Sequence, residues 1–243
     1  MQVYSGIEKI TNQSRRRPAE LVCVVPVTER WTVARHAEEA LDIISGSKNG
    51  VVLDAGTGMY LNAILLDIPM APKVPALVRE AAQRATVDDA NPRRASRSAE
   101  LEMSGADKRG SIWSGDLRYE TTMLYIRPQR DVLDASISER SERICETGLG
   151  EARMIQRMQK EGQEINPSVL EAVGVAEMLQ LADGRITAEQ ARDRISARTR
   201  RLARKQMRWF DKLARTIGNR ARIVTVGDPQ GGELNTMHDT MWE

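Results

Sequence analysis

The sequence predicts an α/β fold with a helical C-terminal half, and three features carry this prediction. The β-branched apolar run LVCVVPV at 21–27 is typical of a buried strand. Residues 51–66 combine a short apolar strand, the glycine-rich turn DAGTG and a helical stretch. Such a strand–turn–helix unit can present backbone N–H groups to a phosphate. From residue 131 to residue 216, apolar positions recur at helical spacing.

The individual elements follow from local signals along the chain. Asn49-Gly50 ends a helical pattern ahead of the second strand, and three prolines between 69 and 75 mark a linker. The expected strands are 21–27, 51–53, 121–126 and 222–226. The expected helices are 32–44, 59–66, 77–84, one opening at Asn91, 131–147, 150–161, 168–181 and 187–216.

The longest expected element is the helix 187–216. Thr187 and Gln190 form a capping-box start, and Gly218 is placed to end the helix. Steps of four and three residues give one stripe that should face a core: Ile195, Thr199, Leu202, Gln206, Trp209 and Leu213. Thr199 and Gln206 each need a partner, because burying a polar group unpaired costs about 1–3 kcal/mol. Both are therefore candidates for contacts with a site or with neighbouring loops.

The outer face of the same helix is strongly basic. Between residues 192 and 215, ten lysines and arginines accompany two aspartates, a local charge of +8 in a chain whose net charge is +2. Such a local excess is typical of a helix that binds a polyanion. The alternative is a solvated surface helix. Solvated helices usually place a glutamate four residues before a lysine or arginine, and acids are almost absent here.

Composition limits the class of protein. With 243 residues, 41% hydrophobic and 29% charged, the chain suits a soluble globular domain with at most a small appendage. No apolar run approaches about 18 residues and no leader opens the sequence, so neither a membrane span nor a secretion signal is expected. Two cysteines without CxxC spacing favour reduced thiols in the cytoplasm. Two distant histidines give no support for a metal site or a catalytic triad.

Five separated motifs together resemble the tRNA dimethylallyltransferases, also called tRNA isopentenyltransferases. They occur in the order of that family, whose patterns are QVYxG, GGTGLY, NPRRxxRALE, AIGYKE and TRxxAKRQxxWF. In this sequence the motifs are QVYSG at 2–6, AGTGMY at 55–60, NPRRASRSAE at 91–100, AVGVAE at 172–177 and TRRLARKQMRWF at 199–210. The last motif is long and specific, and this favours a family relationship over chance agreement.

The resemblance implies a P-loop NTPase-like parallel sheet, nucleotide (ATP) binding, Mg²⁺ as cofactor and a monomer. It implies transfer of a dimethylallyl group from dimethylallyl diphosphate to N6 of the adenosine 3′ to the anticodon of tRNA. By position, the catalytic residues would be Thr57 and Arg200, with Arg200 neutralising diphosphate. The implied substrate-binding residues are Gln2, Gly56, Gly58, Thr199 and Gln206. The implied tRNA-binding residues are Arg93, Arg94, Arg97, Arg204, Lys205 and Arg208. No residue is implied as a metal ligand.

The sequence also departs from the family pattern. The opening strand, the GxxxxGK[ST] phosphate loop and an Asp ahead of the QVY segment have no counterpart in it. We therefore expect a sheet without its first strand and phosphate loop, and a weak or inactive catalyst. The expected organisation is an α/β core at 1–72 and 119–217, a reduced helical insertion at 73–118 and a flexible tail at 218–243. Two alternatives remain, a non-catalytic tRNA-binding remnant and a nucleotide kinase-like enzyme.

Overall fold

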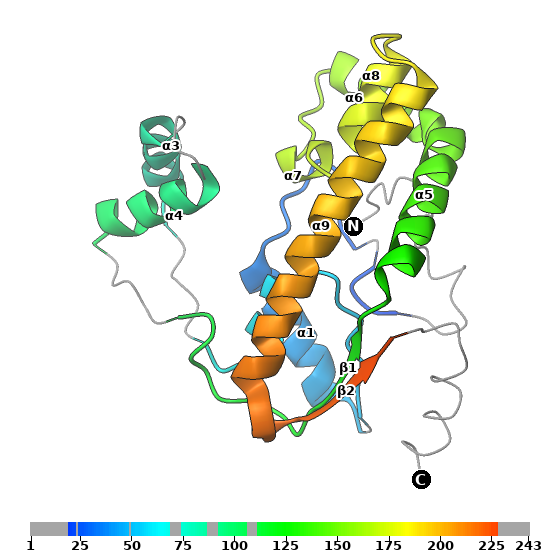
Figure 1. The fold of residues 1–243 in the computed structure, drawn as a ribbon. Coiled ribbons are helices and arrows are strands. Elements are labelled where there is room, and N and C mark those ends of the chain that lie inside the picture. Colours follow the sequence, from blue (N-terminus) through cyan, green and yellow to red (C-terminus); the bar gives the residue numbers. More distant parts are fainter. Residues whose placement is uncertain are drawn as a thin grey trace.

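The computed structural model describes residues 19–22, 24–48, 50–68, 74–86, 92–105 and 111–227, with backbone only at 92–94. Helices dominate this part of the chain (Figure 1). The helices are α1 Val33–Gly46, α2 Gly58–Leu65, α3 Ala76–Ala85, α4 Pro92–Met103, α5 Arg130–Thr147, α6 Leu149–Lys160, α7 Pro167–Leu170, α8 Val175–Ala182, α9 Ala188–Ile217 and the short 3-10 helix η2 Gly218–Arg220. The strands are β1 Thr122–Ile126 and β2 Arg222–Val226.

The two strands form a small parallel sheet, as the α/β prediction requires. Thr122 lies opposite Arg222 and Ile126 opposite Val226, with all of α5–α9 in the connection between the strands. Met123 and Tyr125 are buried on one face, while the side chains between them are exposed. The strands expected at 121–126 and 222–226 are confirmed. Residues 218–226, which belong to the expected flexible tail 218–243, contain η2 and β2, and residues 228–243 lie outside the described residues.

The strands expected at 21–27 and 51–53 are wrong within the described residues. Val25 and Val27 are buried, as predicted for the first run, but the Val27 carbonyl accepts from the backbone N–H of Asn166 at 3.0 Å, next to α7. Val52 is 75% exposed. A strand needs a neighbouring strand for its backbone hydrogen bonds. The described part of the sheet contains only β1 and β2, so these apolar runs stay as loops.

The helix expected at 168–181 is divided in two. Gly174 has a φ of +98°, a conformation that side-chain-bearing residues rarely adopt, and it separates α7 from α8. The Glu177 carboxylate accepts from the Gly174 backbone N–H at 3.1 Å, which caps the new helix start. In contrast, the capping box of Thr187 and Gln190 and the end at Gly218 are confirmed for α9.

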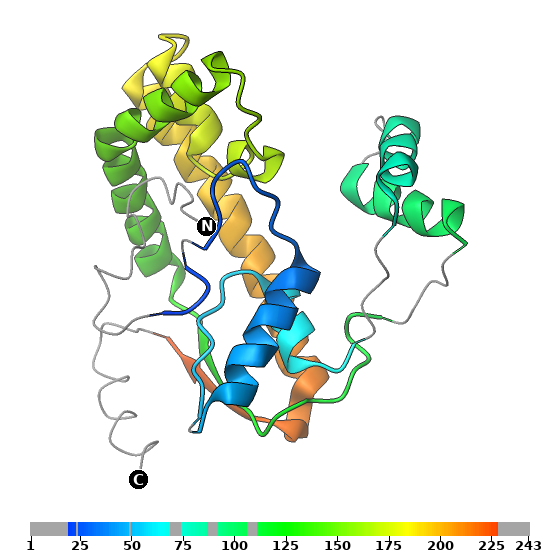
Figure 2. The same ribbon diagram turned by 180° about the vertical axis from the view of Figure 1, so that it is seen from behind.

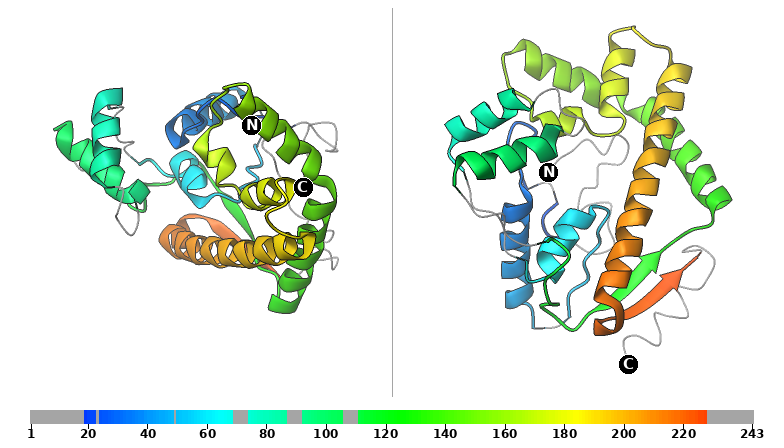
Figure 3. Two further views of the ribbon diagram at one scale, coloured as in Figure 1. Left: turned by 90° about the horizontal axis from the view of Figure 1, so that it is seen from above. Right: turned by 60° about the vertical axis from the view of Figure 1, so that its left-hand side comes forward.

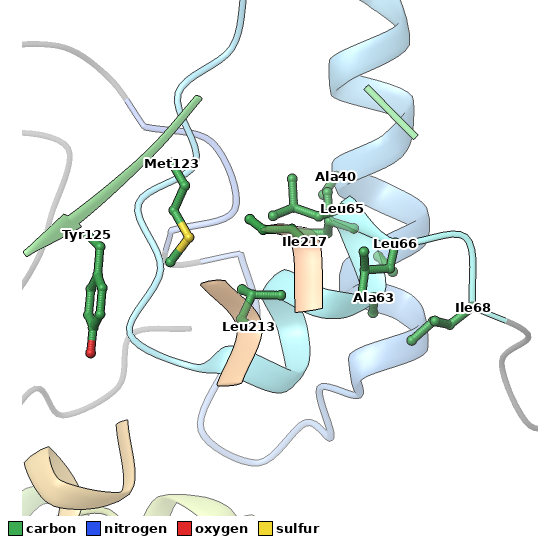
Figure 4. Close-up of a cluster of buried hydrophobic side chains, with 11 residues drawn as sticks. Ala40, Ala63, Leu65, Leu66, Ile68, Met123, Tyr125, Leu213 and Ile217 are labelled. Carbon is green, nitrogen blue, oxygen red and sulfur yellow. The ribbon is translucent and has the colours of Figure 1, made fainter. Parts of the chain in front are cut away.

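Helix α9 joins two separate hydrophobic cores. Its C-terminal end enters the first core through Leu213 and Ile217, which pack with α1, α2 and β1 (Figure 4). Its N-terminal part enters the second core, under α5–α8, through Ile195. Between these ends the stripe is not buried as expected, since Leu202 is 43% exposed. The middle of α9 therefore crosses the space between the cores with its inner face partly open.

Helices α3 and α4 form an arm that stands away from the rest of the molecule (Figures 1 and 2). They pack on each other and fall inside the expected insertion 73–118. At the base of the arm, Leu66 forms an antiparallel bridge with Leu117, and the Asp67 backbone N–H donates to the Asp116 carbonyl at 2.8 Å. In the right-hand view of Figure 3 the arm lies at the upper left, α9 lies at the right, and α2 is seen between them.

Candidate active site at the glycine turn

The glycine turn is fastened to α9 by a hydrogen bond. Gln206 donates from Nε2 to the carbonyl oxygen of Gly56 at 2.7 Å. This contact joins two motifs that lie 150 residues apart. It accounts for the carboxamide in an apolar stripe, which we expected to contact either a site or a neighbouring loop.

One helical turn further along α9, an indole ring lies directly on the turn. A Cβ atom on Gly58 would come within 2.1 Å of Trp209 Cδ1, so the approach requires glycine at residue 58. The Trp209 indole N–H donates to Asn62 Oδ1 at 3.2 Å. Gln206 and Trp209 therefore hold Gly56 and Gly58 at two successive points. We call these four residues the glycine clamp.

Thr57 lies between the two clamped glycines at the start of α2. It is the N-cap residue, yet its side chain makes no capping hydrogen bond and is exposed. Its carbonyl oxygen accepts from the backbone N–H of Leu61 at 3.2 Å. The hydroxyl is thus available at a helix N-terminus, where the helix dipole favours anionic groups.

Thr199 and Arg200 lie further toward the N-terminus of α9, and their side chains hydrogen-bond to residues outside the glycine clamp. The Thr199 hydroxyl donates to the Ile195 carbonyl at 2.8 Å, so it is satisfied within its own helix. Arg200 Nε donates to Asp134 Oδ1 of α5 at 2.9 Å. It lines a polar groove between α5 and α9 with Ser138, Glu142, Arg192, Asp193 and Ser196. The pair is about two-fifths exposed on each side, so a stronger anion could compete for the guanidinium.

The cations of α9 divide into paired and unpaired groups. Arg198 Nη1 donates to both carboxylate oxygens of buried Glu177, at 2.8 and 2.9 Å, which ties α8 to α9. By contrast, seven exposed cations of α9 have no ion pair with any described carboxylate. Among them, Arg194 donates to Gln180 and Lys212 lies over the Trp113 ring, which leaves five. They follow one another at helical spacing and are Arg201, Arg204, Lys205, Arg208 and Arg215. We call these five residues the basic stripe.

The other residues implied by the motifs are placed only in part. Arg97, in α4, donates to Glu100 at 2.6 Å and remains partly exposed on the arm. Gln2 and the side chains of Arg93 and Arg94 lie outside the described residues. The structure therefore brings Gly56, Thr57, Gly58 and Gln206 together, and places Arg97, Thr199 and Arg200 elsewhere.

Sequence reasoning missed two residues next to the glycine clamp. Asn62 is fully buried and bonded to Trp209, and Trp113 lies 4.8 Å from the Trp209 ring between centroids. A polar residue inside the apolar run GMYLNAIL was a usable signal for Asn62, because a buried amide requires partners. Trp113 carried no comparable signal.

Tyr125 joins the sheet to the same helix. Its hydroxyl lies 3.0 Å from Asp211 Oδ1 and 3.2 Å from the Met207 carbonyl, both in α9. Burial, helped by the Asp211 carboxylate, raises the pKa of Tyr125 to about 12. The phenol is therefore a neutral structural donor near neutral pH, and no proton transfer is assigned to it.

The family resemblance implies Mg²⁺, an ion that prefers oxygen ligands, so the carboxylates near the glycine turn are the groups to consider. Within the described ranges, no three His, Cys, Asp or Glu side chains form a group that could hold a metal ion. Asp54 offers one exposed carboxylate two residues before Gly56. Because Mg²⁺ commonly uses one or two carboxylates together with substrate phosphates, the turn fits the ion only as a companion of a diphosphate.

The fold of this chain was compared with the folds of solved structures. Two solved structures share the fold, both described as tRNA isopentenylpyrophosphate transferases. The one from Bacillus halodurans has a TM-score of 0.65 at 22% identity, covering 98% of this chain and 84% of that one. The one from Staphylococcus epidermidis has a TM-score of 0.61 at 18% identity, covering 99% and 88%.

Sequence comparison then gives the family. The sequence model of IPP transferase matches residues 2–213. The tRNA dimethylallyltransferase of Rubrobacter xylanophilus is 54% identical over 244 residues, covering 98% of this chain and 84% of the relative. The enzyme of the same name from Deinococcus radiodurans is 27% identical over 239 residues, covering 86% of this chain and 78% of the relative. The chain belongs to the IPP transferase family, and the resemblance seen in its motifs is confirmed. None of the described helices is long and apolar enough to cross a membrane.

Proposed function

We propose that this protein transfers a dimethylallyl group from dimethylallyl diphosphate to N6 of the adenosine 3′ to the anticodon in tRNA. The observation that carries the proposal is the Gln206–Gly56 hydrogen bond, because it joins the two family motifs in one contact. In the reaction, the N6 lone pair forms a bond to C1 of the dimethylallyl group. The C1–O bond breaks, diphosphate leaves with the electron pair, and N6 loses a proton to water.

The chain's own residues supply positioning and positive charge in this proposal. Thr57, held between the clamped glycines, offers its free hydroxyl where the acceptor base meets the allylic carbon. Arg200 exchanges Asp134 for the leaving diphosphate, since a diphosphate carries more charge than one exposed carboxylate. Half-exposed Leu202, on the same face of α9 as Gln206, offers apolar surface beside the turn.

The basic stripe and the arm would hold the RNA. The stripe offers five exposed cations without described carboxylate partners, and the Arg97 side chain is partly exposed on α4. Lysine and arginine bind phosphates of a nucleic acid by releasing counterions, so this contribution does not depend on base sequence. Arg93 and Arg94, beside Arg97 in the same motif, belong to this proposal, as does Gln2 for the acceptor adenine.

When bound with the diphosphate, Mg²⁺ would supply additional positive charge on the leaving group, near Asp54. We place the protein in the cytoplasm, as a monomer, with 73–118 as the insertion of the α/β core. Nucleotide (ATP) binding, which the family resemblance implies, has no residues assigned to it in this proposal.

A host strain lacking its own enzyme of this activity tests the proposal. Expression of the 243-residue chain should restore dimethylallyl-adenosine in digested tRNA, measured by mass spectrometry of the nucleosides. A chain that binds tRNA in the same cells without restoring the nucleoside would instead be the non-catalytic remnant. ATP-dependent phosphorylation of a nucleotide would favour the kinase-like alternative.

A further inference from the structure

Asn62 is a buried amide with both of its polar ends occupied. The side chain has no exposed surface. Its Oδ1 accepts from the Trp209 indole N–H at 3.2 Å, and its Nδ2 donates to the Ile112 carbonyl at 3.0 Å. One side chain in α2 therefore binds both α9 and the segment that returns from the arm.

The indole that Asn62 orients is also the ring that covers the glycine turn. Trp209 leaves no room for a Cβ on Gly58, so a rotation of the ring would change its contact with the turn. On its other side the ring lies against Trp113, and Lys212 places Nζ 4.4 Å from the Trp113 centroid. The hydrogen bond to Asn62 Oδ1 fixes the orientation of the Trp209 indole against Gly58 and Trp113.

The segment containing Ile112 and Trp113 is the root of the arm. It is fixed against the end of α2 at several points. A Cβ on Gly115 would approach the Asp67 carbonyl to 2.6 Å, and the Arg118 backbone N–H donates to the Leu65 carbonyl at 2.9 Å. The returning segment is thus packed too tightly to move independently of α2.

We propose that Asn62 is a positioning residue that couples the root of the arm to the glycine turn through Trp209. This inference rests on the proposed function, because it assigns the arm to RNA and the turn to the reaction. A displacement of the returning segment is transmitted by Nδ2 to the Asn62 amide and by Oδ1 to the indole. Binding of RNA to the arm therefore affects the position of Thr57 in the glycine turn.

Kinetics of single and double variants test the coupling. Asn62→Leu removes both hydrogen bonds at similar volume, and Trp209→Phe keeps an aromatic ring but removes the donor. At a temperature where every variant is folded, each should lower kcat by about tenfold or more, since small misplacements of reacting groups are costly. KM for tRNA should change by less than about twofold, because Asn62 touches no proposed RNA contact. The double variant should lose no more than the worse single variant.

The control is Asn219→Leu, which changes an exposed asparagine in η2. It should leave kcat unchanged by itself, and in combination with Trp209→Phe it should add nothing to the loss caused by Trp209→Phe. A purely structural role for Asn62 predicts a lower Tm with unchanged kcat of the folded protein. That result, or additive losses in the Asn62 and Trp209 double variant, would overturn the proposal.

Indole NMR signals decide the coupling independently of activity. The chain has four tryptophans, at 31, 113, 209 and 242. In Asn62→Leu the Trp209 indole N–H should shift and exchange faster with solvent, and the Trp113 signal should shift with it, while Trp31 stays unchanged. An unmoved Trp209 signal would contradict the link even if the enzyme is active. If the wild-type chain makes no product, the proposed function fails, and these signals still decide whether Asn62 couples the two segments.

Discussion

Gln206 donates a 2.7 Å hydrogen bond to the carbonyl oxygen of Gly56, and this bond holds the glycine turn against the middle of α9. The middle of the helix is the part that belongs to neither hydrophobic core. The bond therefore fixes Gly56 to a part of α9 that lies outside both cores. Breaking it should affect the geometry of the site more than the stability of the fold.

Replacement of Gln206 by methionine tests this assignment. Methionine keeps the length of the side chain but has no donor, so the Gly56 carbonyl is released. The free energy of unfolding should fall by only about 1 kcal/mol. In a transfer assay kcat/KM should fall by about 10²-fold, since Thr57 moves with the turn. Gln159→Met, at an exposed glutamine of α6, should change neither quantity.

Substitution of Gly58 by alanine should destabilise the protein through a direct clash. The added Cβ would overlap the Trp209 indole at 2.1–2.5 Å, so the ring or α2 must shift, at a cost of about 1–3 kcal/mol. Gly150 lies in the first turn of α6, where an added Cβ would meet open space, so Gly150→Ala should stabilise by at most about 0.5–1 kcal/mol. Urea unfolding of both variants measures this contrast. Equal effects of the two substitutions would contradict the clamp.

The basic stripe predicts a change in salt dependence. The double variant Arg204→Gln/Lys205→Gln should bind tRNA more weakly at low salt. The slope of log K against log salt concentration should become shallower by about 0.7–0.9 for each phosphate that the variant no longer neutralises. Arg153→Gln/Arg157→Gln on exposed positions of α6 is the matched control and should leave the slope unchanged. An identical slope in both double variants would remove the stripe from the RNA interface.

The surroundings of His36 predict that the free energy of unfolding falls in mild acid. Its Nδ1 accepts from the Trp31 indole N–H at 3.2 Å, its ring stacks on Tyr60 at 4.8 Å, and burial lowers its pKa. Nearby Glu39 opposes that shift, and the Arg35 guanidinium lies over Trp31. The folded state therefore favours the neutral ring. Its contribution to stability is complete above about pH 6.5, the pKa of an unperturbed histidine, and is lost as the pH falls below that value.

The measurement is urea unfolding at about pH 7.5 and about pH 5, on either side of the ordinary histidine pKa, compared with His36→Phe. Phenylalanine keeps the stacking on Tyr60 but does not titrate, so the difference between wild type and variant should shrink or reverse in acid. A difference that is independent of pH would show that His36 titrates alike in the folded and unfolded states.

The parts of the fold that could be predicted depend on local signals. The capping box of Thr187, the stop at Gly218 and the polar Gln206 in an apolar stripe are each readable within a few residues, and each is confirmed. The apolar runs 21–27 and 51–53 resemble strands but do not form them, because a strand depends on distant backbone partners that a local pattern does not reveal.

Contacts between side chains that are far apart in the sequence could not be predicted from local patterns either. The contact of Arg200 with Asp134 in α5, and of Asn62 with Trp209, depends on how α9 lies across two cores. Leu202 follows the periodicity of the stripe but is half-exposed, because the periodicity identifies a face and not what covers it. The family motifs implied that the turn and the helix form one site, and the structure shows the Gln206–Gly56 hydrogen bond that joins them.

We propose that this chain, with its clamped glycine turn, transfers a dimethylallyl group to tRNA. The most direct measurement is incubation of the purified 243-residue protein with Mg²⁺, dimethylallyl diphosphate and a tRNA that carries adenosine 3′ to its anticodon. We predict a tRNA product that gains one dimethylallyl group on that adenosine, no product when the base is guanosine, and a strong decrease in product with Gln206→Met. Saturable tRNA binding without any transfer under these conditions would contradict the claim.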